Sequence, residues 1–102
     1  MDTQLPDRWR ALSALQRDVL VVLAQDGPAM GKTVNRELGR DAGLRGPVNR
    51  AIKTLREKGY VETETATGER GEAKHNQLSE RGRELVAAVG KVWYECNVQV
   101  AP

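Results

Sequence analysis

Apolar residues recur at helical spacing early in the chain and predict a helix that begins after Ser13. Ser13 and Gln16 have the spacing of a capping box, and Gly27 followed by Pro28 ends the helix. Its expected inward positions are Leu15, Val19, Val22 and Leu23. The preceding dozen residues read as an irregular arm in which Pro6 opposes a helix and Trp9 is expected to pack on the core.

The same periodicity predicts a short second helix from Lys32 to about Asp41. Val34 and Leu38 are expected to point inward, and the outward positions are Asn35, Arg36 and Arg40. Residues 41–45 then read as a turn, for which we expect Gly43 to supply an unusual backbone angle.

A third helix is predicted from 46 to 58, because Pro47 suits the first helical position and Gly59 suits the end. One face of this helix is apolar and consists of Val48, Ala51, Ile52 and Leu55. The opposite face is polar and basic and consists of Asn49, Arg50, Lys53 and Arg56. Two short helices joined by a turn, the second one basic, form a helix-turn-helix.

After Gly59 the pattern alternates and predicts two strands, 60–65 and 73–78, joined by the hairpin tip ATGERG. Ser79 is expected to cap a last helix that runs to about Asn97. The predicted fold is α+β and mostly α: a winged helix-turn-helix of three helices and a two-stranded wing, followed by a C-terminal dimerisation helix. The expected segments are an arm (1–12), the winged domain (13–79), the dimerisation helix (80–97) and a tail (98–102).

Apolar residues of the last helix repeat at the 4-3-4 spacing of a heptad seam. The seam residues are Leu85, Val89, Val92 and Cys96, with Val86 and Trp93 beside them. We therefore predict that these six residues form a homodimer interface. On this stripe Cys96 is expected to pack, and a redox-sensing role for it is the weaker alternative.

Positive charge is concentrated on one third of the chain. The net charge of the whole sequence is +2, but residues 31–58 hold eight basic and three acidic side chains, a net +5. Residues 59–75 hold two basic and four acidic side chains, a net −2. A localised basic segment on a helix-turn-helix is typical of a surface that binds a polyanion.

Several other classes of protein are disfavoured. The segment GPAMGKT has only three residues between its glycines and follows a predicted helix, so it does not fit a phosphate-binding loop. His75 has no metal-ligand partner at a suitable spacing, no catalytic set stands out, and no cofactor is expected. Because no catalytic set is found, the protein is predicted not to be an enzyme. The lack of a membrane-length apolar run, the N-terminus without a signal-peptide core and the single cysteine together predict a cytoplasmic protein.

Double-stranded DNA is the predicted partner, with helix 46–58 in the major groove. Arginine can pair with guanine and asparagine with adenine, so this face carries the donors that base reading needs. The predicted contacts are Lys32, Thr33, Arg36, Arg45, Asn49, Arg50, Lys53, Thr67, Arg70 and Lys74. Glutamates surround the wing cations, so we expect only the tip, 67–70, to approach DNA. A wing that contacts protein instead is the open alternative.

From about Leu15 to Leu85 the chain resembles the PadR family of winged-helix transcriptional regulators. The resemblance rests on LQRDVLVVLAQDGPAMGKTV, on GPVNRAIKTLREKGYVE and on a closing pattern carried by Leu78, Ser79, Gly82 and Leu85. Lys32, Asn49 and Asn76 stand where that family usually has tyrosines. MarR-like regulators and small archaeal and phage repressors share these motifs in weaker form.

The resemblance implies a DNA-binding repressor that acts as a homodimer and pairs through its extra C-terminal helix. A two-fold protein of this kind is expected to bind an inverted-repeat site. The sequence identifies no small-molecule effector. The rival interpretation is a winged helix that serves as a protein-interaction module, with its basic helix docked on an acidic partner and no affinity for DNA.

Overall fold

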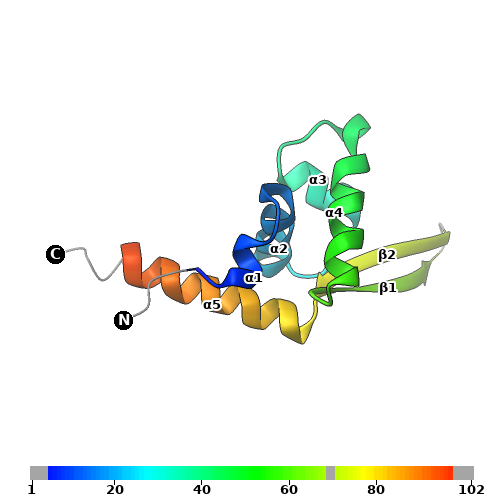
Figure 1. Cartoon of the computed structure of the whole chain (residues 1–102). Helices are drawn as coiled ribbons and strands as arrows, with labels where there is room; N and C mark the ends of the chain where they lie inside the picture. Colours follow the sequence, from blue (N-terminus) through cyan, green and yellow to red (C-terminus); the bar gives the residue numbers. More distant parts are fainter. Residues whose placement is uncertain (1–4, 69–70, 98–102) are drawn as a thin grey trace.

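The computed structural model describes residues 5–68 and 71–97, and for 66–68, 72 and 91–97 it describes the backbone only (Figure 1). The elements, in order, are α1 (Asp7–Arg10), α2 (Ala14–Asp26), α3 (Gly31–Glu37), the 3₁₀ turn η1 (Ala42–Leu44), α4 (Gly46–Glu57), β1 (Val61–Gly68), β2 (Gly71–Leu78) and α5 (Glu80–Asn97). The predicted mostly helical architecture with a two-stranded antiparallel wing is confirmed. None of the helices described has the length and apolar character needed to cross a bilayer.

Helix α2 begins and ends as predicted. The Ser13 hydroxyl accepts a hydrogen bond from the Gln16 amide, and the Gln16 side chain accepts one from the Ser13 amide, so the capping box is formed. The helix ends at Gly27, whose φ of 79° favours glycine.

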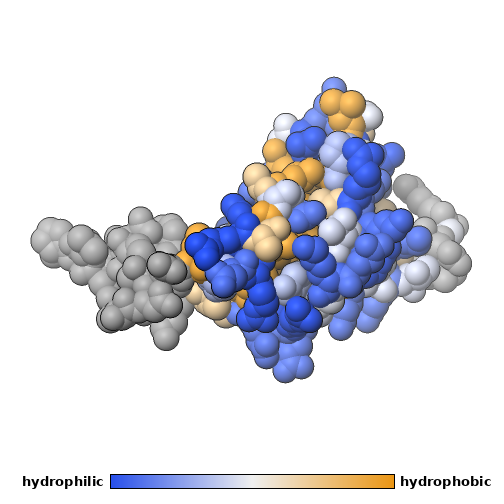
Figure 2. All heavy atoms as spheres, viewed as in Figure 1, coloured by the Kyte–Doolittle hydropathy of each residue, from blue (hydrophilic) through white to orange (hydrophobic). Residues whose placement is uncertain are grey.

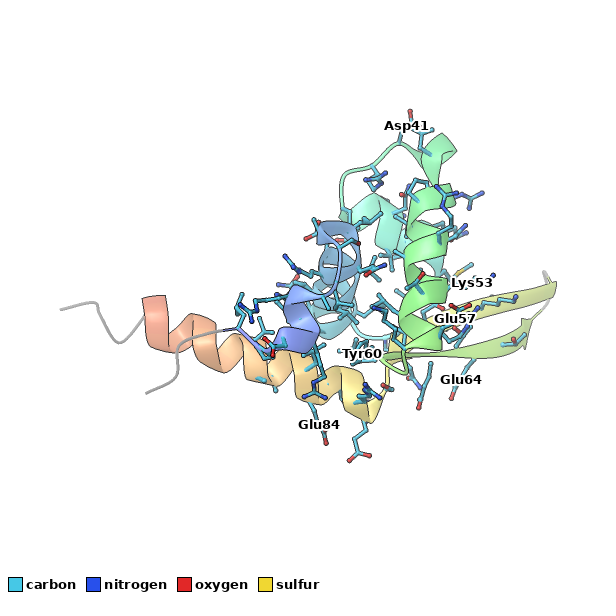
Figure 3. All side chains as sticks on the ribbon, viewed as in Figure 1. Asp41, Lys53, Glu57, Tyr60, Glu64 and Glu84 are labelled. Carbon is cyan, nitrogen blue, oxygen red and sulfur yellow. The ribbon has the colours of Figure 1, made fainter. Side chains whose placement is uncertain are left out.

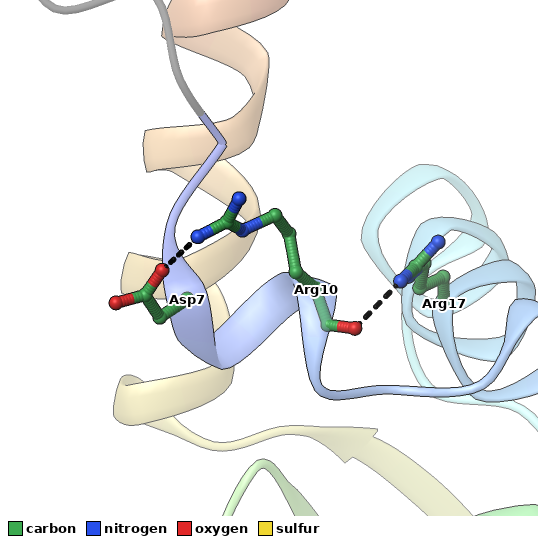
Figure 4. A network of polar contacts seen from close by, with 3 residues as sticks. All are labelled: Asp7, Arg10 and Arg17. Atoms are coloured by element: carbon green, nitrogen blue, oxygen red, sulfur yellow. Dashed lines mark hydrogen bonds and ion pairs between the residues drawn. The ribbon is translucent and has the colours of Figure 1, made fainter.

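The arm before α2 is more ordered than predicted (Figure 4). Pro6 precedes the short helix α1 instead of preventing one, because proline is tolerated at a helix start. Trp9 is buried, as expected. Arg17 of α2 donates from Nε to the Trp9 carbonyl at 3.0 Å and from Nη2 to the Arg10 carbonyl at 2.9 Å, and Arg10 pairs with Asp7. These bonds hold α1 against α2.

The helix-turn-helix differs from the prediction in two places. In α3, which ends at Glu37, Asn35 is buried and is therefore not an outward-facing residue. Its side chain is only 1% exposed, because Nδ2 donates to the Asp41 carbonyl at 3.0 Å and supports the turn from inside. The glycine with positive φ is Gly39, at 70°, and not Gly43, which lies in η1 under a hydrogen bond from its amide to the Asp41 side chain.

The wing is longer than predicted and is anchored at its base. Strands β1 and β2 pair in antiparallel register from Val61 opposite Leu78 to Gly68 opposite Gly71. In addition to this pairing with β1, Asn76 of β2 exchanges two backbone hydrogen bonds of 2.9 Å each with Ala29. The turn between α2 and α3 therefore acts as a single-residue third strand beside β2.

Helix α5 starts where the chain passes very close to the end of α4. The Ser79 hydroxyl accepts a hydrogen bond from the Gly82 amide at 3.0 Å, which confirms the predicted cap. Ser79 also joins the preceding turn, since its amide donates to the Tyr60 carbonyl at 3.0 Å and its hydroxyl donates to the Gly59 carbonyl. Arg81 lies over the Tyr60 ring, with 5.0 Å from Cζ to the ring centroid.

One apolar core joins helices α1 to α5 and the base of the wing. Helices α2 and α4 contribute most of it, and α1, α3, the wing base and the start of α5 close it. Leu85 belongs to this core with 0% of its surface exposed, and Val86 and Val89 pack partly against it. The prediction that Leu85 contacts a second subunit is therefore wrong, because its own chain already covers it.

We predict that Gly82→Ala destabilises the fold, by about 3 kcal/mol, the upper end for overpacking. An added methyl group would lie 2.1 Å from the Tyr60 carbonyl oxygen, and both groups belong to backbone that the core holds. The measurement is chemical denaturation followed by circular dichroism.

The matched control is Gly90→Ala on the same helix, where an added methyl group meets nothing within 4 Å. It should gain up to about 1 kcal/mol, because alanine favours a helix more than glycine does. Equal effects of the two substitutions would show that the close approach at Gly82 does not constrain the fold.

Candidate nucleic-acid interface

The polar face of α4 and the outer side of α3 form one basic surface. Figure 2 shows that the part of this surface in view is mainly hydrophilic, with a small apolar patch at the tip over η1 and the start of α4. That tip includes Leu44, which is 61% exposed. The predicted contact residues that are exposed on this surface are Lys32, Arg36, Arg45, Asn49, Arg50 and Lys53, while Thr33 is half-buried.

Among the described residues, no carboxylate neutralises the cations of this surface. In the part of the chain that the structure describes, the ion pair formed is Arg10 with Asp7, far from this surface in sequence. None of the eight basic side chains between 31 and 58 pairs with a described carboxylate. Charges that are left unpaired and close together repel one another, so such a surface is suited to a polyanionic partner.

A groove separates α4 from the wing. We call it the wing groove, and it has a volume of about 350 Å³. Its walls carry three cations, Lys53 and Arg56 from α4 and Lys74 from β2. Figure 3 shows Lys53 leaving α4 on the side toward the wing. The remaining lining residues are Gly31, Asn49, Ile52, Thr63 and Asn76.

A chain of hydrogen bonds runs along the wing groove. Arg56 Nη1 donates to Thr63 Oγ1 at 3.1 Å, and that hydroxyl donates to Asn76 Oδ1 at 2.8 Å. Asn76 Nδ2 then donates to the Ala29 carbonyl at 3.2 Å. A reversed Asn76 amide would place two oxygens against each other at Ala29, so the direction of every bond in the chain is fixed.

A second hollow, the turn pocket, lies between α3 and the turn that follows it and has a volume of about 460 Å³. Four cations line it: Lys32, Arg36, Arg40 and Arg45. Asn35 lies at its wall, and its Oδ1 has no hydrogen-bond partner among the described residues. The described part of the basic surface therefore has two hollows, the turn pocket beside the start of α4 and the wing groove along residues 49–56 of that helix.

Two predicted contacts lie against nearby helix backbone, Asn49 against α3 and Arg50 against α4. An added Cβ at Gly31 would lie 2.7 Å from Asn49 Oδ1, so this amide rests over the start of α3. An added Cβ at Gly46 would lie 3.3 Å from Arg50 Nη1, so the guanidinium folds back along α4. Both side chains are exposed on their outer side, where a partner can reach them.

Other predicted site residues lie outside what the structure describes. This holds for Arg70 altogether and for the side chain of Thr67, so their predicted DNA contacts stay predictions. The same applies to the side chains of Val92, Trp93 and Cys96, although the helical backbone of α5 reaches Asn97 as predicted. Lys74 is described, and it lies on the wing groove together with α4.

Sequence reasoning placed Arg56 on the polar face of α4 but did not name it as a site residue. The usable signal was its spacing from Asn49 and Lys53, which follows one helix face. It did not name Arg40 either, which joins the turn pocket only because α3 ends early. Within the described residues no group of three His, Cys, Asp or Glu side chains could hold a metal ion.

No protein-family model matches the sequence, and no curated protein is significantly similar to it. The likeness to known proteins lies in structure. RV1404 from Mycobacterium tuberculosis matches with a TM-score of 0.72 at 22% identity, over 91% of this chain and 63% of that one. The transcriptional regulator Tm0710 from Thermotoga maritima matches with a TM-score of 0.74 at 19% identity, over the same shares. A MarR-like transcriptional regulator from Thermotoga maritima, tm0816, gives a TM-score of 0.76 at 15% identity, over 95% and 68%.

These identities are low enough that the shared property is the fold. The chain also spans only 63% of the length of the first two structures. The PadR-like assignment stays a prediction, since the likeness extends to MarR-like proteins and does not select the PadR family. The chain thus has the winged-helix fold that these transcriptional regulators share.

Proposed function

We propose that this protein is a sequence-specific, double-stranded DNA-binding transcriptional regulator, a repressor, that binds an inverted-repeat site as a homodimer. The observation that carries the proposal is the unpaired basic surface of α3 and α4 on a winged-helix scaffold. In a helix-turn-helix the second helix enters the major groove, so α4 is the reading helix. The likeness to proteins described as transcriptional regulators supports the same conclusion.

The position of each basic or polar side chain suggests whether it contacts bases or the DNA backbone. Asn49, Arg50 and Lys53 are exposed on α4 and are proposed to reach base edges. Lys32, Arg36 and Arg45 surround the turn pocket and are proposed to hold the DNA backbone, with Thr33 beside them. Thr67 and Arg70 at the wing tip are proposed to touch the backbone from the other side.

The homodimer is proposed to form through the distal half of α5. Leu85 is excluded because it lies in the core, and Val86 and Val89 retain only part of their surface. In the sequence, Val92, Trp93 and Cys96 continue the same helix face from Val89 at spacings of three, one and three residues. A helix that extends past its domain with an apolar face is suited to pair with its own copy.

Substitution of a residue that contacts bases should lower the affinity for the preferred duplex most, whereas substitution of a residue that contacts phosphates should lower the affinity for all duplexes. Arg50→Ala and Asn49→Ala should each cost about 1–3 kcal/mol on the preferred duplex and much less on random DNA. Lys32→Ala should weaken binding to both duplexes by similar factors, because phosphates are the same in every sequence. Fluorescence anisotropy with a duplex obtained by selection measures both. An unchanged ratio of specific to random affinity in Arg50→Ala would contradict the reading role of α4.

Binding should depend steeply on salt. If each subunit of a dimer neutralises about three to five phosphates, the log–log slope of affinity against salt concentration should lie near about −5 to −9. The selected site should be an inverted repeat whose half-sites are about 34 Å apart, one turn of duplex. A flat salt dependence, or no affinity for DNA at low salt, would favour a protein-interaction module over a DNA-binding regulator.

Val92→Glu should convert the dimer to monomers, because it places a charge on the proposed seam. Sedimentation velocity at micromolar concentration measures this. Ala87→Glu is the matched control, since Ala87 is exposed on the same helix and its replacement adds the same charge away from the seam. A wild-type protein that sediments as a monomer would refute the proposed homodimer.

A further inference from the structure

We propose that the wing groove is a binding site for a single backbone phosphate of DNA, and that Arg56 is its principal ligand. This inference rests on the proposed function, which names the basic surface but gives Arg56 no part in it. The groove is lined by three cations from two separate elements, Lys53 and Arg56 on α4 and Lys74 on β2. Convergent cations in a concave site are suited to one anion of high charge density.

Arg56 differs from the two lysines because it is held in place. One of its five N–H donors is bonded to Thr63 Oγ1 at 3.1 Å, and no described carboxylate pairs with it. The remaining donors form a planar fork that matches the oxygens of a phosphate, whereas lysine offers a mobile point charge. A guanidinium that is already oriented loses less conformational freedom when it binds.

Thr63 and Asn76 are positioning residues for this site. The Thr63 hydroxyl gives its only proton to Asn76 Oδ1 at 2.8 Å, so its lone pairs are free to accept from Arg56. Asn76 is 5% exposed and is itself fixed to the α2–α3 turn through Ala29. Through this chain of hydrogen bonds, the orientation of the Arg56 side chain is fixed relative to the α2–α3 turn as well as to the wing.

The first test compares two substitutions that remove the same charge near the same end of α4. Arg56→Gln should weaken binding to the selected duplex about tenfold, the loss of a charge-assisted contact, and should make the salt slope shallower by about 1. Lys58→Gln is the matched control, because Lys58 is exposed just after α4 and does not line the wing groove. It should weaken binding at most about twofold.

The second test separates positioning from charge. Thr63→Val removes the hydroxyl at nearly constant volume and should weaken binding about threefold, with the salt slope nearly unchanged because Arg56 keeps its charge. Thr65→Val is the control, because Thr65 lies on the same face of β1 and no hydrogen bond among the described residues joins its side chain to α4. A loss of affinity in Thr65→Val equal to that in Thr63→Val would overturn the positioning role.

The deciding experiment places a neutral methylphosphonate at each backbone position of the selected duplex in turn. One position should weaken the wild type by the same factor as Arg56→Gln, and the same position should weaken Arg56→Gln no further. Additive losses at every position would overturn the proposed contact between Arg56 and a single phosphate.

A titration without DNA distinguishes failure of the groove from failure of the proposed function. In ¹H–¹⁵N spectra, inorganic phosphate should shift the side-chain Nε–H signal of Arg56 in the wild type and in Lys58→Gln, and the nearby backbone signals should not shift in Arg56→Gln. If these shifts occur in a protein that does not bind DNA, the anion site stands and the regulator proposal fails. If DNA binds but Arg56→Gln behaves like Lys58→Gln, the groove proposal fails and the regulator proposal stands.

Discussion

The pairing of Ala29 with Asn76 is the contact on which the geometry of the interface depends. A two-stranded hairpin is marginally stable alone, so the wing takes its position from what holds its base. Two backbone hydrogen bonds and the Asn76 amide fix β2 to the turn between α2 and α3. The same side chain is bonded through Thr63 to Arg56, so one buried amide connects the α2–α3 turn, the wing and α4. These bonds line the wing groove.

Local signals account for most of what the sequence predicted of the fold. The capping box at Ser13, the proline at 47 and the cap at Ser79 each mark a helix start through groups within three residues. The predictions that were wrong concern segments whose structure depends on residues from another element. A four-residue helix such as α1 spans little more than one period of 3.6 residues, too short for the apolar pattern to repeat, and it is held by Arg17 from another helix. Asn35 is buried because the Asp41 carbonyl turns toward it, which no helical periodicity can indicate.

The part of the candidate site that lies on one face of α4 could be predicted from the sequence, because its residues recur at helical spacing. The outer face of α4 could be read from the spacing of Asn49, Lys53 and Arg56, but the wing groove requires the register of β2 against α4. Leu85 shows the opposite failure. An apolar stripe on α5 indicates that something covers it, and the pattern is the same whether the cover is the chain's own core or a second copy. For Leu85 the cover is the core, and only the distal stripe is left for a partner.

We propose that α4 reads bases while the turn pocket and the wing groove hold the DNA backbone. The most direct measurement is the set of ¹H–¹⁵N signals that move when the protein binds its selected duplex, compared with an unrelated duplex of equal length. We expect Arg56 and the cations of the turn pocket to shift with either duplex, and Asn49 and Arg50 to shift strongly with the selected duplex alone. Shifts confined to α5 and α1, or the same set of shifted residues with both duplexes, would contradict this proposal.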